Sequence, residues 1–136
     1  MKRFASTTAL FVAIAGFSMH AQTLNLRASI PFDFRVGKVL MPAGDYDIYR
    51  TGEVVRVRSE NGTITGAMFL TLPTTGSEQR TLGGLEFNRY DDTYFLAKIF
   101  SPYSKDGRAF PKSAQEKALV ARGATVQTAA VVTRQK

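Results

Sequence analysis

The run LNLRASIPFDFRV, residues 24–36, decides the fold class because apolar and polar residues alternate along it without a break. Every even position is apolar, and the odd positions are Asn25, Arg27, Ser29, Pro31, Asp33 and Arg35. A period of two over 13 residues predicts a β-strand with one buried and one solvent-facing side. Pro31 has no amide proton, so the strand has an unpaired edge there or bends. We favour a bend that carries the chain from one sheet to another.

The next stretch, MPAGDYDI at residues 41–48, fits a turn followed by a strand. Pro42 suits the second position of a type I turn, and Gly44 suits a closing position with positive φ, as in a common hairpin connection. After the turn, Tyr46 and Ile48 share one face, which predicts that they anchor the turn to the core. A ligand-binding loop is the alternative, and we favour the structural corner.

Short strands and turns fill the middle of the chain. A strand at 54–59 has Val55 and Val57 on one face and Arg56 and Arg58 on the other, and Asn61-Gly62 predicts a hairpin turn. The following strand, 63–72, places Ile64, Met68, Leu70 and Leu72 on one face, and residues 73–84 read as a polar loop. Strands at 85–90 and 93–100 flank Asp91-Asp92.

The C-terminal part contains the one predicted helix. Residues 101–111 look irregular, after which SAQE at 113–116 matches a capping box in which Ser113 and Glu116 bond each other's amides. The helix is expected over 114–122, ending at Gly123. Residues 124–136 form a strand or a tail, and we favour a strand. The chain is therefore mainly β: a single β-sandwich or small barrel of six to seven antiparallel strands with one short C-terminal helix.

The N-terminus predicts export. Lys2 and Arg3 precede the apolar run 4–17, and SMHA ends at Ala21, a pattern typical of a cleaved signal peptide over residues 1–21. The expected mature protein is one domain, residues 22–136, with 16 basic and 11 acidic residues and a net charge of +5. No later stretch is apolar enough to be expected to span a membrane, so we predict a secreted or periplasmic protein.

Histidine, cysteine and tryptophan are all missing from the expected mature chain, and the first two absences limit the chemistry. The sequence has no cysteine, and its one histidine, His20, lies in the signal segment. Disulfides, zinc or haem sites built on these residues and catalysis by a His base or a Cys nucleophile are therefore excluded. We predict no cofactor and no enzymatic activity. A carboxylate-dependent glycan hydrolase is the alternative, since two acids suffice for that chemistry.

Three groups of side chains are candidate sites. The acid pairs Asp45/Asp47 and Asp91/Asp92 could bind a cation, although each also fits a solvated strand face or turn. An aromatic-rich stretch could stack on sugars with help from Arg89, or could simply pack in the core: Tyr90, Tyr94, Phe95, Phe100, Tyr103 and Phe110.

Arginines form the third group and our candidate ligand-binding site. Arg27, Arg56 and Arg58 occupy outward positions of their strands, with Arg35 and Arg50 nearby in the sequence. Such a basic face suits an anionic envelope glycan or lipid surface, and nearby acids could instead neutralise it. No nucleic-acid partner is expected, because the chain has no known reader motif.

Several segments together resemble a group of small exported bacterial proteins. The segments are IPFDFRVGKVLMPAGDYDI (30–48), LEFNRYDDTYFLAKIF (85–100) and GRAFPKSAQEKAL (107–119). The group shares an F-x-F-x-V-G…L-P-A-G-x-Y-x-I core and a G-R-x…P-K-S-x-x-E segment, and Met41 stands where it usually has Leu. The similarity runs from about Ala28 to Arg122 and implies export and the fold. The group has no assigned activity, so no site residue is carried over.

Overall fold

The structure, a computed structural model, describes residues 23–60 and 67–135. The predicted signal peptide, the Asn61-Gly62 turn and Ile64 lie outside the described residues.

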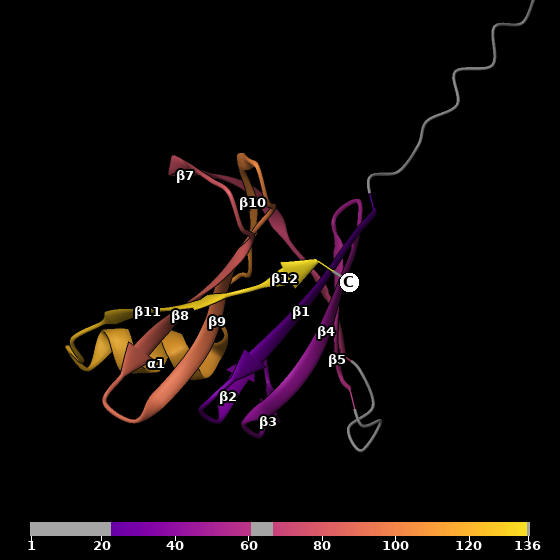
Figure 1. Cartoon of the computed structure of the whole chain (residues 1–136). Coiled ribbons are helices and arrows are strands. Elements are labelled where there is room, and N and C mark those ends of the chain that lie inside the picture. Colours follow the sequence, from indigo (N-terminus) through magenta and orange to yellow (C-terminus); the bar gives the residue numbers. More distant parts are fainter. Residues whose placement is uncertain (1–22, 61–66, 136) are drawn as a thin grey trace, which may run out of the picture.

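Two β-sheets pack face to face and form a β-sandwich, which confirms the predicted fold class (Figure 1). Sheet 1 is antiparallel with the order β12-β1-β4-β5-β6. Its strands are β1 (Thr23–Ile30), β4 (Gly44–Thr51), β5 (Val54–Ser59), β6 (Ala67–Leu70) and β12 (Arg134–Gln135).

Sheet 2 has the order β11-β8-β9-β10-β7, with β2 pairing in parallel to β9 and β3 pairing to β2. Its strands are β2 (Phe34–Val36), β3 (Val39–Met41), β7 (Leu72–Arg80), β8 (Gly84–Tyr90), β9 (Thr93–Phe100), β10 (Ser104–Ala109) and β11 (Gln127–Val132). The strands are more numerous than expected because the first predicted strand is split and two predicted irregular segments are strands.

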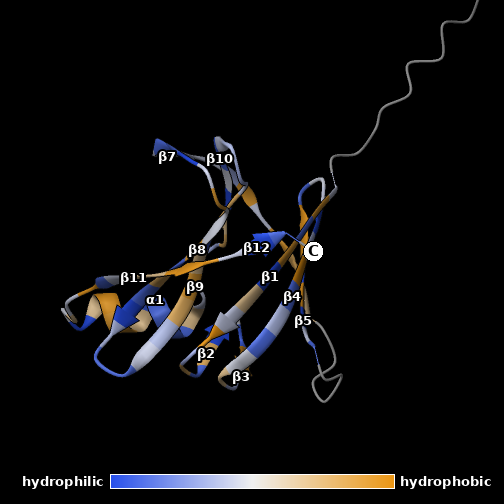
Figure 2. Ribbon diagram, in the orientation of Figure 1, coloured by the Kyte–Doolittle hydropathy of each residue, from blue (hydrophilic) through white to orange (hydrophobic). Residues whose placement is uncertain are grey.

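The core lies between the sheets and is built from the inward positions of both. Figure 2 shows apolar residues along strands of both sheets. The alternation in residues 24–36 is responsible on one side, since Leu26, Ala28 and Ile30 are buried and the residues between them are not. Its fully buried large side chains include Leu26, Phe34, Met41, Tyr46, Ile48, Val55, Val57, Leu85, Phe87 and Ile99.

The chain changes sheet at four places. Residues 31–33 connect β1 of sheet 1 to β2 of sheet 2, which confirms the bend predicted at Pro31. Pro42 and Ala43 lead from β3 back to β4, Thr71 joins β6 to β7, and Thr133 joins β11 to β12. The last two of these crossings join edge strands of the two sheets.

The Pro42 turn is structural, as favoured, but it is not a hairpin. It joins strands of different sheets, with the Ala43 amide donating to Asp33 Oδ1 at 2.8 Å and the Tyr46 hydroxyl donating to the Pro42 carbonyl. Gly44 has φ +157°, which is positive as predicted, but it is close to extended backbone because Gly44 is the first residue of β4 and does not close a turn in the left-handed conformation.

Met68 and Leu70 share one side of β6, as predicted, but that side faces outward, and Leu72 belongs to β7 of the other sheet. Phe69 packs inward against Phe110, with ring centroids 6.0 Å apart, whereas Met68 and Leu70 point outward and are 62% and 71% exposed. The reason is that β6 is the edge strand of sheet 1, where the large aromatic ring takes the core side and the aliphatic residues are left outside.

The two segments read as irregular, 73–84 and 101–111, largely pair with each other as β7 and β10. They escaped prediction because their side chains are mostly polar and lie at a sheet edge, so burial imposes no alternation on them.

The C-terminal predictions hold with one correction. Helix α1 (Ala114–Ala121) starts after Ser113, whose hydroxyl accepts from the Glu116 amide at 3.2 Å, and Gly123 follows it with φ +80°. The predicted strand in 124–136 is confirmed as β11 and β12. The Glu116 carboxylate, however, accepts from Asn88 on β8 at 2.9 Å rather than completing a capping box, and so attaches α1 to the outer side of sheet 2.

Candidate functional site

The three arginines predicted as a ligand site lie together on the outer side of sheet 1. In the strand register Arg27 pairs with Asp47, and Asp47 pairs with Arg58 on the next strand. Arg134 of β12 pairs with Arg27 on the other side. We call Arg27, Arg56, Arg58 and Arg134 the arginine face.

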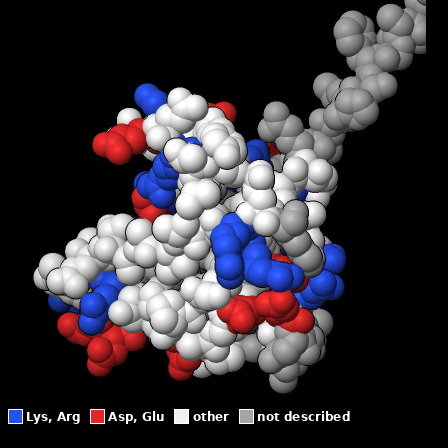
Figure 3. Space-filling model, viewed as in Figure 1, with Lys and Arg blue, Asp and Glu red and all other residues white. Residues whose placement is uncertain are grey.

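Acidic side chains neutralise part of the arginine face. Arg27 Nε lies 3.4 Å from Asp47 Oδ1, and Arg27 Nη2 lies 3.2 Å from Glu60 Oε1. Figure 3 accordingly shows basic and acidic side chains next to each other over β1 and β4. Arg58 is exposed, and its guanidinium lies 5.6 Å from the centre of the Tyr49 ring. The exposed arginines of this face are therefore Arg56 and Arg58 on β5 and Arg134 on β12.

Exposed apolar side chains adjoin these β5 arginines. Arg56 pairs with Met68 across the β5–β6 ladder, and Arg56 Nη2 donates to Met68 Sδ at 3.3 Å. Val54 pairs with Leu70 two residues further along the same ladder, so Leu70 lies on the same outer side as Met68. Two arginines and two exposed aliphatic side chains thus form one amphipathic area, which we call the β5–β6 patch: Arg56, Arg58, Met68 and Leu70.

The predicted acid pairs do not form a site. Asp47 is buried beside Arg27, while Asp45 is exposed and accepts from the Ser29 hydroxyl at 2.5 Å. Asp91 has φ +52° in the turn between β8 and β9. Within residues 23–60 and 67–135 no three acidic or other ligating side chains gather to hold a metal ion.

The aromatic-rich stretch is mainly packing, as favoured. Tyr90, Phe95 and Phe100 are buried, and Tyr94 stacks on Phe32 with ring centroids 3.8 Å apart. Tyr103 alone among the aromatics named for this stretch is largely exposed, at 66%. A stacking platform made by several of these rings is therefore not present on the surface.

A polar pocket of about 390 Å³ opens where the inner faces of the two sheets diverge, and the sequence did not reveal it. Arg50 reaches it from β4, two positions beyond the core residue Ile48, and Arg108 reaches it from β10, paired with Ile99. We call this the arginine pocket; its lining is Arg50, Pro73, Thr74, Thr75, Ser101, Ser104, Asp106, Gly107 and Arg108.

The two arginines are held differently. Arg108 is 6% exposed; its Nε donates to the Thr71 hydroxyl at 2.9 Å and its Nη2 to the Thr71 carbonyl. It therefore fixes the corner between β6 and β7. Arg50 donates only its Nε, to the Gly52 carbonyl at 3.0 Å, and within the described part of the chain its terminal nitrogens have no hydrogen-bond partner.

The charges in the pocket are unbalanced. Burial lowers the pKa of Arg50, the positive charge of Arg108 lowers it further, and Asp106 partly opposes both effects. Asp106 is the one carboxylate among the described lining residues, so two guanidinium groups share a single negative charge. Two-carboxylate glycan hydrolysis has no second acid in this lining.

The sequence contains a signal for one of the two pocket arginines, Arg50. Arg50 has the same strand parity as Tyr46 and Ile48, which marks it as an inward arginine. Arg108 and Asp106 gave no such signal because their segment was not recognised as a strand.

Comparison with known proteins identifies no relative of this chain. The sequence matches no protein-family model, and neither curated proteins nor solved structures gave a match. Within the described residues, no helix is both long enough and apolar enough to cross a membrane. The resemblance to small exported bacterial proteins stays a prediction.

Proposed function

We propose that the protein is an exported, non-enzymatic binding domain that associates with an anionic surface of the cell envelope. The observation that carries this proposal is the β5–β6 patch, where exposed Arg56 and Arg58 adjoin exposed Met68 and Leu70. The signal-like N-terminus and the lack of histidine and cysteine beyond it support export and a binding role.

An anionic lipid surface suits this patch better than a glycan. Arginines attract acidic headgroups, each contributing about 1 kcal/mol near such a surface, and aliphatic side chains gain free energy by entering the region below the headgroups. A glycan would use the charges but would leave Met68 and Leu70 exposed to water. The lipid therefore accounts for both parts of the patch.

Binding to vesicles tests the proposal. The purified protein should sediment with phosphatidylglycerol-containing vesicles, and the bound fraction should fall as salt is raised because salt screens the arginines. An Arg56→Glu, Arg58→Glu variant should bind at least about 30-fold more weakly, since two attractive charges are lost. A Met68→Ser, Leu70→Ser variant should weaken binding while leaving its salt dependence.

The control variant makes the same charge change elsewhere: Lys112→Glu with Lys117→Glu, both exposed and next to or on α1. Equal losses in the two charge variants would reduce the effect to net charge and contradict the patch. Retention on an acidic polysaccharide but not on vesicles would assign the arginines to a glycan. Intact mass of exported protein tests export separately, because a mass that includes residues 1–21 would contradict cleavage after Ala21.

A further inference from the structure

The arginine pocket is independent of the proposed lipid contact. It opens on the inner side of sheet 1, whereas Arg56 and Arg58 lie on the outer side. The hydrogen bonds of Arg108 to Thr71 give it a structural role, whereas Arg50 makes only one hydrogen bond among the residues that the structure describes, to Gly52. A half-buried guanidinium with unpartnered terminal nitrogens, placed beside a second positive charge, is costly unless an anion joins it.

We propose that the arginine pocket binds a sugar acid, with its carboxylate on Arg50 and its hydroxyls on the facing polar side chains. A guanidinium group presents two parallel N–H donors that match a carboxylate, so the free end of Arg50 is a suitable receptor. Arg108 contributes a fixed positive charge behind it.

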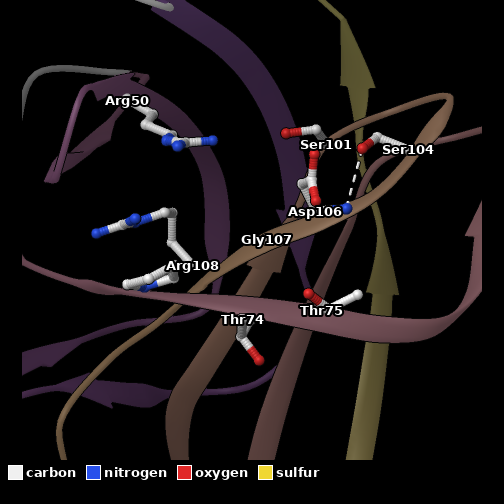
Figure 4. Close-up of a pocket in the computed structure, with 9 residues that line it drawn as sticks. Arg50, Thr74, Thr75, Ser101, Ser104, Asp106, Gly107 and Arg108 are labelled. Atoms are coloured by element: carbon white, nitrogen blue, oxygen red, sulfur yellow. Dashed lines mark hydrogen bonds between the residues drawn. The ribbon is translucent and has the colours of Figure 1, made fainter.

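The opposite side of the pocket suits hydroxyl groups. Figure 4 shows Arg50 and Arg108 on one side and Ser101, Ser104 and Asp106 on the other. Ser104 Oγ accepts from the Asp106 amide at 2.9 Å, which leaves the Ser104 proton for a ligand oxygen. The Asp106 carboxylate is an acceptor for a ligand hydroxyl. A volume of about 390 Å³ is within the range of small-molecule sites.

The charge balance favours a monoanion. Two arginines and Asp106 give the lining a net charge of +1, which one carboxylate neutralises. A phosphate dianion would bring excess negative charge next to Asp106, and a neutral sugar would leave the two arginines uncompensated. We therefore expect affinity to decrease from a uronate to a sugar phosphate, and further to the neutral sugar.

Calorimetry and NMR titration of the purified protein with D-galacturonate test this proposal. D-galactose and galactose 1-phosphate are the neutral and dianionic comparisons, and trigalacturonate distinguishes a free sugar acid from a unit of a polymer. Galacturonate should bind at millimolar or lower concentration and shift the amide resonances of Ser101, Asp106 and Arg108, which line the pocket.

Three variants locate the binding. Arg50→Gln should weaken galacturonate binding at least tenfold, while Arg56→Gln on the outer side of the same sheet should leave it unchanged. Asp106→Asn should improve binding of galactose 1-phosphate relative to galacturonate about tenfold. Arg108 is left intact because it holds the Thr71 corner.

Each outcome decides for or against the pocket. Equal binding of galactose and galacturonate, equal effects of the Arg50 and Arg56 variants, or no binding of any uronate would overturn the proposal. Vesicle binding is unaffected in the Arg50→Gln variant if the two sites are independent, so failure here leaves the lipid proposal standing.

Discussion

Glu116 offers the sharpest test of how the helix is attached to the sandwich. Glu116 lies in the first turn of α1 and is 4% exposed. Its carboxylate accepts hydrogen bonds from Asn88 Nδ2 at 2.9 Å and from the Tyr90 hydroxyl at 3.4 Å. No arginine or lysine in the described residues forms an ion pair with it. Two uncharged donors from β8 therefore carry the contact.

The expected cost of losing the carboxylate follows from these partners. A hydrogen bond to a charged group is worth about 1.5–3 kcal/mol, and Tyr90, at 3% exposure, has little access to replacement water. The bond from Tyr90 is long and adds less than the bond from Asn88. We expect Glu116→Ala to lower the free energy of unfolding by about 2–3 kcal/mol. Glu116→Gln retains an acceptor oxygen and should lower it by about 1 kcal/mol.

Urea unfolding at neutral pH, followed by far-UV circular dichroism, measures both values. Glu78→Ala, an exposed acid on β7, is the matched control and should change the free energy of unfolding by less than about 0.5 kcal/mol. A cycle with Tyr90→Phe should show coupling between Glu116 and Tyr90. If Glu116→Ala behaves like the Glu78 control, the carboxylate does not attach α1 to the sheet and our reasoning is refuted.

Three further outcomes are expected. Burial, followed by the charge and hydrogen bond of Glu116, raises the pKa of the Tyr90 hydroxyl above 10.0 in the folded protein. The stability that the protonated Tyr90 contributes is therefore complete below pH 10.0 and is lost as the pH rises through the folded pKa. Urea midpoints measured as the pH is raised from below 10.0 should fall less for Tyr90→Phe than for the unchanged protein. Gly107→Ala should cost more than about 2 kcal/mol, because its Cβ would lie 2.5 Å from the Ile99 carbonyl oxygen, whereas Gly52→Ala, with no atom within 4 Å and only a positive φ of +59° to strain it, should cost about 1 kcal/mol. Thermal unfolding compares them, and equal losses would contradict the close β9–β10 approach. Ser113→Ala should cost about 1 kcal/mol and Ser113→Asp should recover most of it in the same assay.

Where burial on one side constrains the residues, the sequence predicts the fold well. The alternation through Ile30 and Phe34 predicts one long strand with an inward-facing side, and Pro31 within it predicts the bend that carries the chain to the other sheet; the structure divides this run into β1 and β2 at that bend. The helix start at Ser113 was predictable for a different, local reason: the capping hydroxyl accepts from the amide three residues later.

Where burial does not constrain them, the prediction fails. β7 and β10 pair with each other at a sheet edge, and their polar side chains carry no period of two. On β6 the apolar residues occupy both sides, so periodicity alone could not tell that Phe69 turns inward and Met68 outward. For this reason the sequence did not predict the apolar half of the β5–β6 patch, Met68 and Leu70.

The arginine pocket shows how one unrecognised strand conceals a site. Strand parity places Arg50 inward, yet an inward arginine alone indicates only a buried charge whose partner is unknown. Its neighbour Arg108 lies far along the chain and reaches the pocket because β10 pairs with β9 through Arg108 and Ile99. That register depends on Gly107, where any side chain would collide with β9. Gly107 thus allows β10 to lie close against β9, and this close pairing brings the second arginine to the pocket.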